Sequence, residues 1–173
     1  TLFRQMTEGK EKKMIKETFS HFLSPDYISE ILEDPDKLVL GGEEREITAH
    51  FSDLAKFSTL SERLGSSEKL VEVLNRYLGP MTDVILQSKG TVDKYEGDAI
   101  IAFYGAPLYL PNHAELAVVA GLAEQKQTAE IEKDLEQANL LPEGCRIVAR
   151  IGLNSGPATV GLMGSDFRKD YTM

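Results

Sequence analysis

Two acidic residues stand where a pair of carboxylates could act together. Asp53 ends a predicted strand over residues 45–53, and Asp98 lies in a tight turn between predicted strands over residues 91–95 and 99–104. If the first strand lies beside this hairpin, the two carboxylates meet at one edge of the sheet. Oxygen ligands without His or Cys suit Mg²⁺ or Mn²⁺, and paired ions of this kind drive in-line displacement at phosphorus. The residues alone also allow a plainer reading, with Asp53 as a helix cap and Asp98 as a turn residue.

The segment after Asp53 leads into a short predicted helix over residues 58–64. The first backbone N–H groups of a helix have no carbonyl partner within it, and such groups bind phosphate. The residues concerned are Leu54, Ala55, Lys56, Phe57 and Ser58. This segment therefore predicts a phosphate-binding loop next to the carboxylates.

Hydrophobic spacing and turn residues predict the elements that position these groups. Helices are expected over residues 1–22, from Ser24 to about 33, over 67–88 with an interruption and kink at Gly79-Pro80, and over 112–139; a second hairpin is expected from strands 146–153 and 158–164 around Asn154-Ser155-Gly156-Pro157. The order β-α-β-β-α-β-β predicts an α+β fold of the ferredoxin-like, split βαββαβ type with an extra strand.

Composition narrows the class of function. The length of 173 residues suits one domain, and 19 basic against 28 acidic residues give a net charge of −9, which disfavours a nucleic-acid partner. The single cysteine, Cys145, cannot form an internal disulfide, which fits a reducing compartment. The longest mostly apolar stretch, residues 99–108, is far shorter than the ~20 residues that cross a membrane.

Three ordered segments resemble the signatures of class III adenylate/guanylate cyclase catalytic domains. They are Phe51–Glu62, Gly90–Pro107, and Arg150–Gly156 followed by residues 160–165 and 170–172. The resemblance implies the class III cyclase fold, with residues 1–43 as a helical linker and 44–173 as a catalytic domain that is truncated at its C-terminus. Gly41-Gly42-Glu43-Glu44, which is similar to a diguanylate cyclase hairpin, is interpreted as part of the linker.

The resemblance also implies roles for individual residues. Asp53 and Asp98 match the two aspartates that bind two metal ions per site, Mg²⁺ or Mn²⁺, and Leu54 matches the residue whose carbonyl joins them. Lys94 and Thr172 match the pair that reads the nucleotide base. A lysine at the first of these positions donates to the acceptor N1 of adenine, so ATP is the expected substrate and cyclic AMP the expected product. Without the resemblance, Lys94 reads as a solvated charge at a strand end.

Sites in this family form between two chains, so a homodimer is expected. The family's transition-state Asn and Arg are expected beyond Met173, and residues 1–173 alone are therefore expected to be inactive or nearly so. Residues 8–44 resemble the linker of bacterial receptor-type cyclases. This implies a cytoplasmic domain of a membrane-anchored receptor with an upstream sensor domain.

Two residues depart from the family pattern. Lys56 stands where glycine is usual, and Glu96 replaces an apolar residue close enough to draw Lys94 into an ion pair. These departures keep open a cyclase-like module that binds nucleotide or a partner chain without turnover. A guanylate cyclase is the other alternative, which Lys94 disfavours. His50 is interpreted as a partly buried strand residue and not as a ligand.

Overall fold

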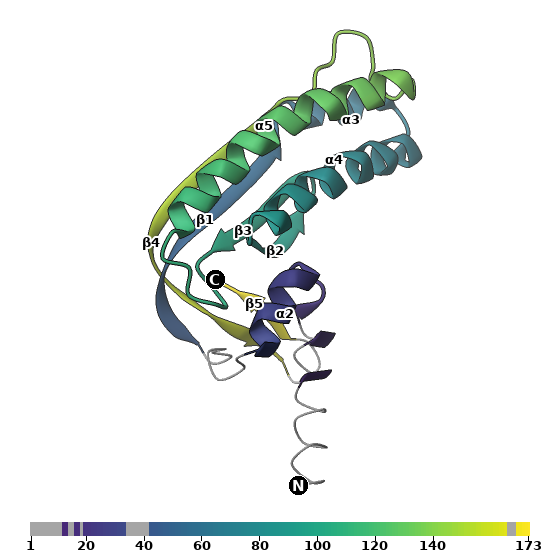
Figure 1. Ribbon diagram of the computed structural model, residues 1–173. Coiled ribbons are helices and arrows are strands. Elements are labelled where there is room, and N and C mark those ends of the chain that lie inside the picture. Colours follow the sequence, from purple (N-terminus) through teal and green to yellow (C-terminus); the bar gives the residue numbers. More distant parts are fainter. Residues whose placement is uncertain (1–11, 14–15, 18, 34–41, 166–168) are drawn as a thin grey trace, which may run out of the picture.

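The computed structural model describes residues 12–13, 16–17, 19–33, 42–165 and 169–173 (Figure 1). The predicted helix over residues 1–22 lies mostly outside these residues. The elements are α2 (Pro25–Glu33), β1 (Glu43–Leu54), α3 (Phe57–Leu64), α4 (Ser67–Gln87), β2 (Thr91–Glu96), β3 (Ala99–Tyr104), α5 (His113–Gln137), β4 (Ala149–Gly164) and β5 (Lys169–Thr172). No helix among the described residues is long and apolar enough to cross a membrane.

The strands form one five-stranded antiparallel sheet in the order β2-β3-β1-β4-β5. The first four positions are those of the split βαββαβ arrangement, and β5 is added at one edge. The predicted α+β class is therefore confirmed, whereas the added strand is β5 over residues 169–172 and not the predicted strand over residues 158–164. β1 begins at Glu43, so Glu43 and Glu44 belong to the first strand and not to the linker.

The predicted second hairpin is wrong. Residues 149–164 form one continuous strand, β4, which runs along β1 for twelve residue pairs from Glu43↔Val160 to Leu54↔Ala149 (Figure 1). Gly156-Pro157 suggests a turn, but Pro157 lies opposite Glu46, where β4 pairs with β1 alone among the described strands. A missing N–H is tolerated on the open side of a strand. The partner of β4 is thus a distant strand and not its own second half.

The two faces of the sheet carry different layers, as the alternation along β1 requires. His50, Ser52 and Leu54 face helices α4 and α5, where the larger core also includes Tyr77 and Ile100. On the opposite face lies a second core that joins the linker to the sheet. Its buried members include Phe19, Leu23, Tyr27, Ile28 and Ile31 from the linker and Ile47, Phe103, Val160 and Tyr171 from the strands.

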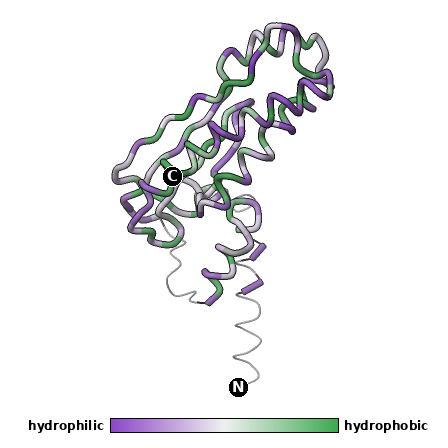
Figure 2. The backbone as a smooth tube through the Cα atoms, turned by 45° about the horizontal axis from the view of Figure 1, so that its top comes forward, coloured by the Kyte–Doolittle hydropathy of each residue, from purple (hydrophilic) through white to green (hydrophobic). Residues whose placement is uncertain are grey.

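Helix α4 runs without interruption through Gly79 and Pro80, which corrects the expected break. Ser66 caps its N-terminus, since the Ser66 side chain accepts a hydrogen bond from the Lys69 N–H at 3.4 Å. One stripe of the helix is buried and most exposed positions are polar, so green and purple alternate along the two long helices at the upper right of Figure 2. This amphipathic burial against the sheet offsets the cost of an internal proline.

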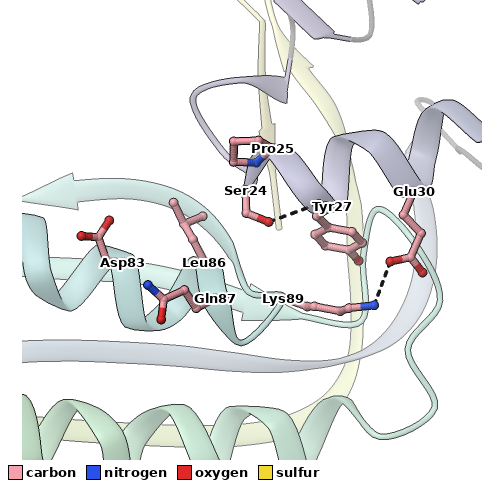
Figure 3. Close-up of a pocket in the computed structure, with 8 residues that line it drawn as sticks. All are labelled: Ser24, Pro25, Tyr27, Glu30, Asp83, Leu86, Gln87 and Lys89. Carbon is pink, nitrogen blue, oxygen red and sulfur yellow. Dashed lines mark hydrogen bonds and ion pairs between the residues drawn. The ribbon is translucent and has the colours of Figure 1, made fainter.

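Helix α2 is fixed to the end of α4, as the close-up in Figure 3 shows. Ser24 caps α2 as predicted, because its Oγ accepts the Tyr27 N–H at 3.2 Å. Lys89, just past α4, forms an ion pair with Glu30 at 2.7 Å. The two helix ends enclose a pocket of about 420 Å³. Residues 19–33 are therefore packed onto the rest of the fold, close to β2, where the Val92 N–H donates to the Phe22 carbonyl.

Candidate active site

The structure brings the segments that carry the two candidate metal ligands together. The register of β1 with β3 places Ser52 opposite Ile100, so the end of β1 meets the β2–β3 turn. There the Asp98 carboxylate accepts a hydrogen bond from the Leu54 N–H at 2.8 Å. The predicted convergence of Asp53, Leu54 and Asp98 at one sheet edge is confirmed as a geometry, whereas their binding of metal stays a prediction.

Arg150, to which sequence reasoning gave no role, is the cation beside these carboxylates. It lies opposite Asp53 in the β1–β4 ladder and makes two parallel hydrogen bonds to it, Nε to Oδ1 and Nη2 to Oδ2, both at 2.7 Å. These bonds are the largest cause of the raised pKa of Arg150. The negative charge of Asp53 and, more weakly, that of Asp98 raise this pKa further. The guanidinium thus neutralises a site that has a surplus of negative charge.

This donor set fits a divalent metal ion. It consists of hard carboxylate oxygen atoms, although no cluster of three or more His, Cys, Asp or Glu side chains occurs here or elsewhere among the described residues. The Arg150 side chain is 66% exposed, so it can leave Asp53 without unpacking the core. Mg²⁺ is commonly held by one or two carboxylates and completes its shell with substrate phosphates and water.

The loop after Asp53 is only partly free to bind phosphate. The Ala55 N–H donates to the Val148 carbonyl at 2.8 Å, so that predicted phosphate ligand is already used. Lys56 precedes α3 with φ 60° and ψ 30°, a left-handed conformation, and its side chain does not cap the helix. This backbone explains why glycine suits the position. The N–H groups of Phe57 and Ser58, in the first turn of α3, remain candidates.

Lys94 and Thr172, the predicted base-reading pair, lie at a second site. They line one pocket of about 720 Å³ together with Asp93, Asp170 and Phe22. Asp93 joins the pair: its Oδ2 accepts the Thr172 hydroxyl at 2.8 Å and lies 3.7 Å from the Lys94 ammonium. The contact connects β2 to β5, the two ends of the strand order. The ion pair expected between Glu96 and Lys94 is thus taken by Asp93.

Sequence reasoning gave Asp93 no role, because regular strand alternation would place its side chain on the face opposite Lys94. Its side chain is only 4% exposed, and burial raises its pKa, opposed by the hydrogen bond from Thr172 and by the charge of Lys94. An acidic residue beside a lysine on a strand normally signals a solvated edge. The position of this carboxylate depends on a β-bulge in β2 between Val92 and Lys94.

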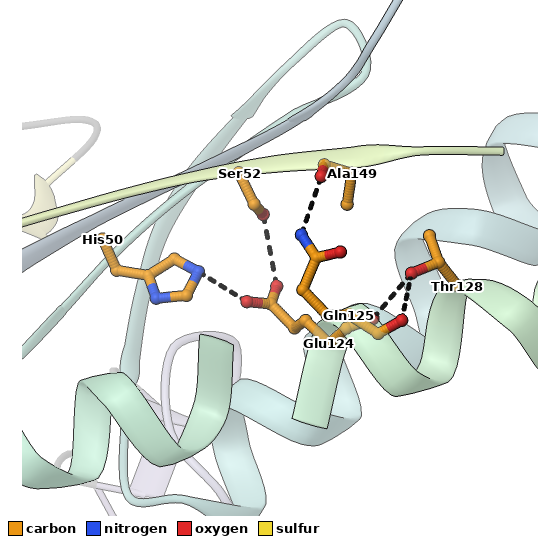
Figure 4. Close-up of polar contacts among 6 residues, drawn as sticks. All are labelled: His50, Ser52, Glu124, Gln125, Thr128 and Ala149. Atoms are coloured by element: carbon orange, nitrogen blue, oxygen red, sulfur yellow. Dashed lines mark hydrogen bonds and ion pairs between the residues drawn. The ribbon is translucent and has the colours of Figure 1, made fainter. Parts of the chain in front are cut away.

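A third polar cluster lies in the core beneath Asp53. The Glu124 carboxylate, from α5, is fully buried and contacts the His50 Nε2 at 2.8 Å and the Ser52 hydroxyl at 3.2 Å (Figure 4). Next to it, Gln125 donates to the Ala149 carbonyl at 2.8 Å. His50 is therefore a structural residue as predicted, although it is fully and not partly buried. The cluster ties α5 to the strands that carry Asp53 and Arg150.

Comparison with known proteins identifies the family. A sequence model described as the adenylate and guanylate cyclase catalytic domain matches residues 41–173. The chain belongs to the class III adenylate and guanylate cyclase family. The cyclase resemblance of the sequence motifs is thus confirmed.

Relatives of this cyclase domain include an adenylate cyclase and an uncharacterised protein, both much longer than this chain. Adenylate cyclase 1 of Rhizobium meliloti is 34% identical over 128 residues, which are 74% of this chain and 18% of the relative. An uncharacterised protein of Mycobacterium tuberculosis is 29% identical over 174 residues, 99% of this chain and 28% of the relative. This chain therefore spans less than a third of the length of these relatives.

Solved cyclase structures confirm the fold. The guanylyl cyclase Cya2 is 38% identical, with a TM-score of 0.70 over 77% of this chain and 65% of that one. The adenylyl cyclase CyaB from P. aeruginosa is 34% identical, with a TM-score of 0.70 over 77% of this chain and 67% of that one. Similarity alone thus leaves the choice between ATP and GTP to the residues of the site.

Proposed function

We propose that this domain is an adenylate cyclase that converts ATP to 3′,5′-cyclic AMP and pyrophosphate. The observation that carries the proposal is the pocket in which Lys94 and Thr172 meet through Asp93. A lysine donates hydrogen bonds only, which suits adenine N1 and not the N1–H of guanine. The adenylate cyclase of Rhizobium meliloti and CyaB support the same substrate.

In the reaction, the ribose 3′ oxygen forms a bond to the α-phosphorus, its proton is lost, and the bond from that phosphorus to the pyrophosphate oxygen breaks. Two Mg²⁺ or Mn²⁺ ions, held by Asp53, Asp98 and the Leu54 carbonyl, would supply the positive charge that favours this displacement. Arg150, which now binds Asp53, would offer its donors to the phosphates once Asp53 is needed as a metal ligand. Lys94 and Thr172 hold the base, and the N–H groups at the start of α3 hold phosphate oxygens.

The proposal includes a homodimer with sites shared between chains. Phe51 lies two residues before Asp53, so both point to the sheet face opposite α4 and α5. Its side chain is 49% exposed, and its strand neighbour Gly152 leaves open space beside it. An exposed aromatic ring next to the carboxylates supports a second chain packing there. Sedimentation of the wild type and of Phe51→Ser tests this, because the variant should favour the monomer.

The test of the catalytic proposal is production of cyclic AMP from ATP with Mn²⁺ by the full-length gene product. Asp53→Asn and Asp98→Asn should each lower kcat at least about a hundredfold, because each removes a charge that holds a metal ion. Asp134→Asn, the same substitution on the exposed surface of α5, is the matched control and should leave turnover unchanged. Absence of product from the wild type, or full activity of Asp53→Asn, would refute the proposal.

The second candidate is a cyclase-like module that binds nucleotide without turnover. The ion pair between Arg150 and Asp53 favours it, because this contact engages both oxygens of a metal ligand. Calorimetry distinguishes the two candidates: ATP binding by a full-length protein that yields no cyclic nucleotide supports the module.

A further inference from the structure

The carboxylate of Asp93 lies behind both residues of the proposed base-reading pair. Lys94 points to solvent with half of its side chain exposed, whereas Asp93 is almost fully buried. A buried carboxylate costs free energy unless it is paired, and here its partners are the Thr172 hydroxyl and the Lys94 ammonium. The arrangement therefore fixes the orientation of the Thr172 hydroxyl and the position of the Lys94 ammonium.

A β-bulge makes the arrangement possible. In the β2–β3 ladder Val92 pairs with Ala102 and Lys94 pairs with Ile101, so Asp93 is an extra residue on β2. Consecutive residues of a regular strand face opposite sides, but a bulge redirects one of them. Asp93 and Lys94 therefore line the same pocket, with Thr172 of β5 beside them.

The hydrogen bonds then fix the polarity of the pocket. A threonine hydroxyl has a single proton. The short bond commits it to the Asp93 carboxylate at 2.8 Å, and the other contact of the hydroxyl, to the Met173 carbonyl, is longer at 3.4 Å. Both contacts direct the proton toward the protein. Thr172 is thus left with lone pairs to offer a ligand, while Lys94 next to it offers only donors.

We propose that Asp93 is a positioning residue that sets the base preference of this site, by making Thr172 an acceptor beside the donor Lys94. The inference rests on the proposed function and names a residue that determines its base specificity. Adenine presents an N6 amino donor next to the N1 acceptor, which matches this pair. Guanine presents the O6 acceptor and an N1–H donor, which is the reverse pattern. The negative field of Asp93 and of Asp170, which also lines the pocket, adds to the rejection of O6.

The test measures discrimination between ATP and GTP in Asp93→Ala and Asp93→Val, neither of which has a side-chain acceptor for the Thr172 hydroxyl. The ratio of the two dissociation constants is determined by calorimetry with Mn²⁺, and the ratio of kcat/KM is determined for the full-length gene product. Once the hydroxyl of Thr172 can rotate and donate to O6, the preference for ATP should fall at least about tenfold, the effect of one redirected hydrogen bond. Asp134→Ala is the matched control and should keep the wild-type ratio.

A purely structural role for Asp93 would weaken both nucleotides equally and leave the ratio unchanged, so an unchanged ratio in a folded variant overturns the inference. If the Asp93 variants do not fold, Thr172→Val decides: it removes the acceptor and should also lower the preference, part of which Lys94 still provides, and an unchanged ratio again overturns the inference. A wild type that turns over ATP while the variants keep its selectivity refutes only this inference. A wild type that binds neither nucleotide refutes the proposed function with it.

Discussion

Replacement of Glu124 by Gln tests the buried cluster that supports the active site. The carboxylate is fully buried and is held by the His50 Nε2 at 2.8 Å and the Ser52 Oγ at 3.2 Å. Loss of the carboxylate from this buried polar contact costs about 3 kcal/mol, because the buried imidazole and hydroxyl lose their charged partner. At about 2–4 °C per kcal/mol for a domain of this size, the Tm should fall by about 10 °C.

The assay is thermal and urea unfolding followed by circular dichroism, with Glu130→Gln as control. Glu130 lies on the same helix but is exposed, so its substitution should leave the Tm unchanged. The double substitution Glu124→Met/His50→Leu should regain most of the lost stability, because an apolar pair of similar volume replaces a buried polar pair and leaves no polar group unsatisfied. A Tm shift below about 3 °C for Glu124→Gln, or a double variant no more stable than the single one, would refute this account of the core.

Three further predictions concern single side chains. Arg150→Gln should lower kcat/KM for ATP and leave the Tm almost unchanged, because its ion pair with Asp53 is exposed; a large loss of Tm would contradict this. Lys56→Gly should stabilise the fold by about 0.5–1 kcal/mol in urea titrations, since the left-handed backbone strains a lysine and no gain would refute the strain. Partial burial alone would raise the pKa of Glu132. Hydrogen bonds from Arg146 and from the Ile147 N–H outweigh this effect, so the pKa of Glu132 is lowered from its usual value. A lowered pKa stabilises the folded state above the unfolded-state pKa and loses that effect as the pH falls through the folded-state value, so Glu132→Gln should cost about 1 kcal/mol at pH 7 and nothing at low pH.

Local sequence pattern was sufficient for the carboxylate edge of the site. Alternating apolar residues identify the first strand, and the Gly97-Asp98 turn identifies the hairpin, so the meeting of Asp53 with Asp98 follows from the topology. The same pattern could not find Glu124, which lies 72 residues after Ser52 in the chain and meets it only when α5 packs on the sheet. A buried carboxylate on a helix with mixed polarity leaves no periodic signal.

The base-reading edge was harder to predict, because it depends on an exception to strand alternation. The motif match gave Lys94 and Thr172 from the family resemblance, but a regular strand would place Asp93 on the face opposite Lys94. Only the bulge in β2 places Asp93 between them. Sequence periodicity describes the regular ladder, and a functional residue at a bulge departs from it.

The unbroken β4 strand connects the carboxylate edge of the chain to its base-reading edge. Near its start it carries Arg150 opposite Asp53, and near its end it pairs with β5, which carries Thr172. A hairpin at residues 154–157 would have folded the second half of this strand back on the first. Val160 could then not lie opposite Glu43, and β5 could not reach Asp93 on β2. The long β1–β4 ladder therefore fixes the carboxylate edge relative to the base-reading edge within one chain, although in the proposed homodimer these two edges serve different sites.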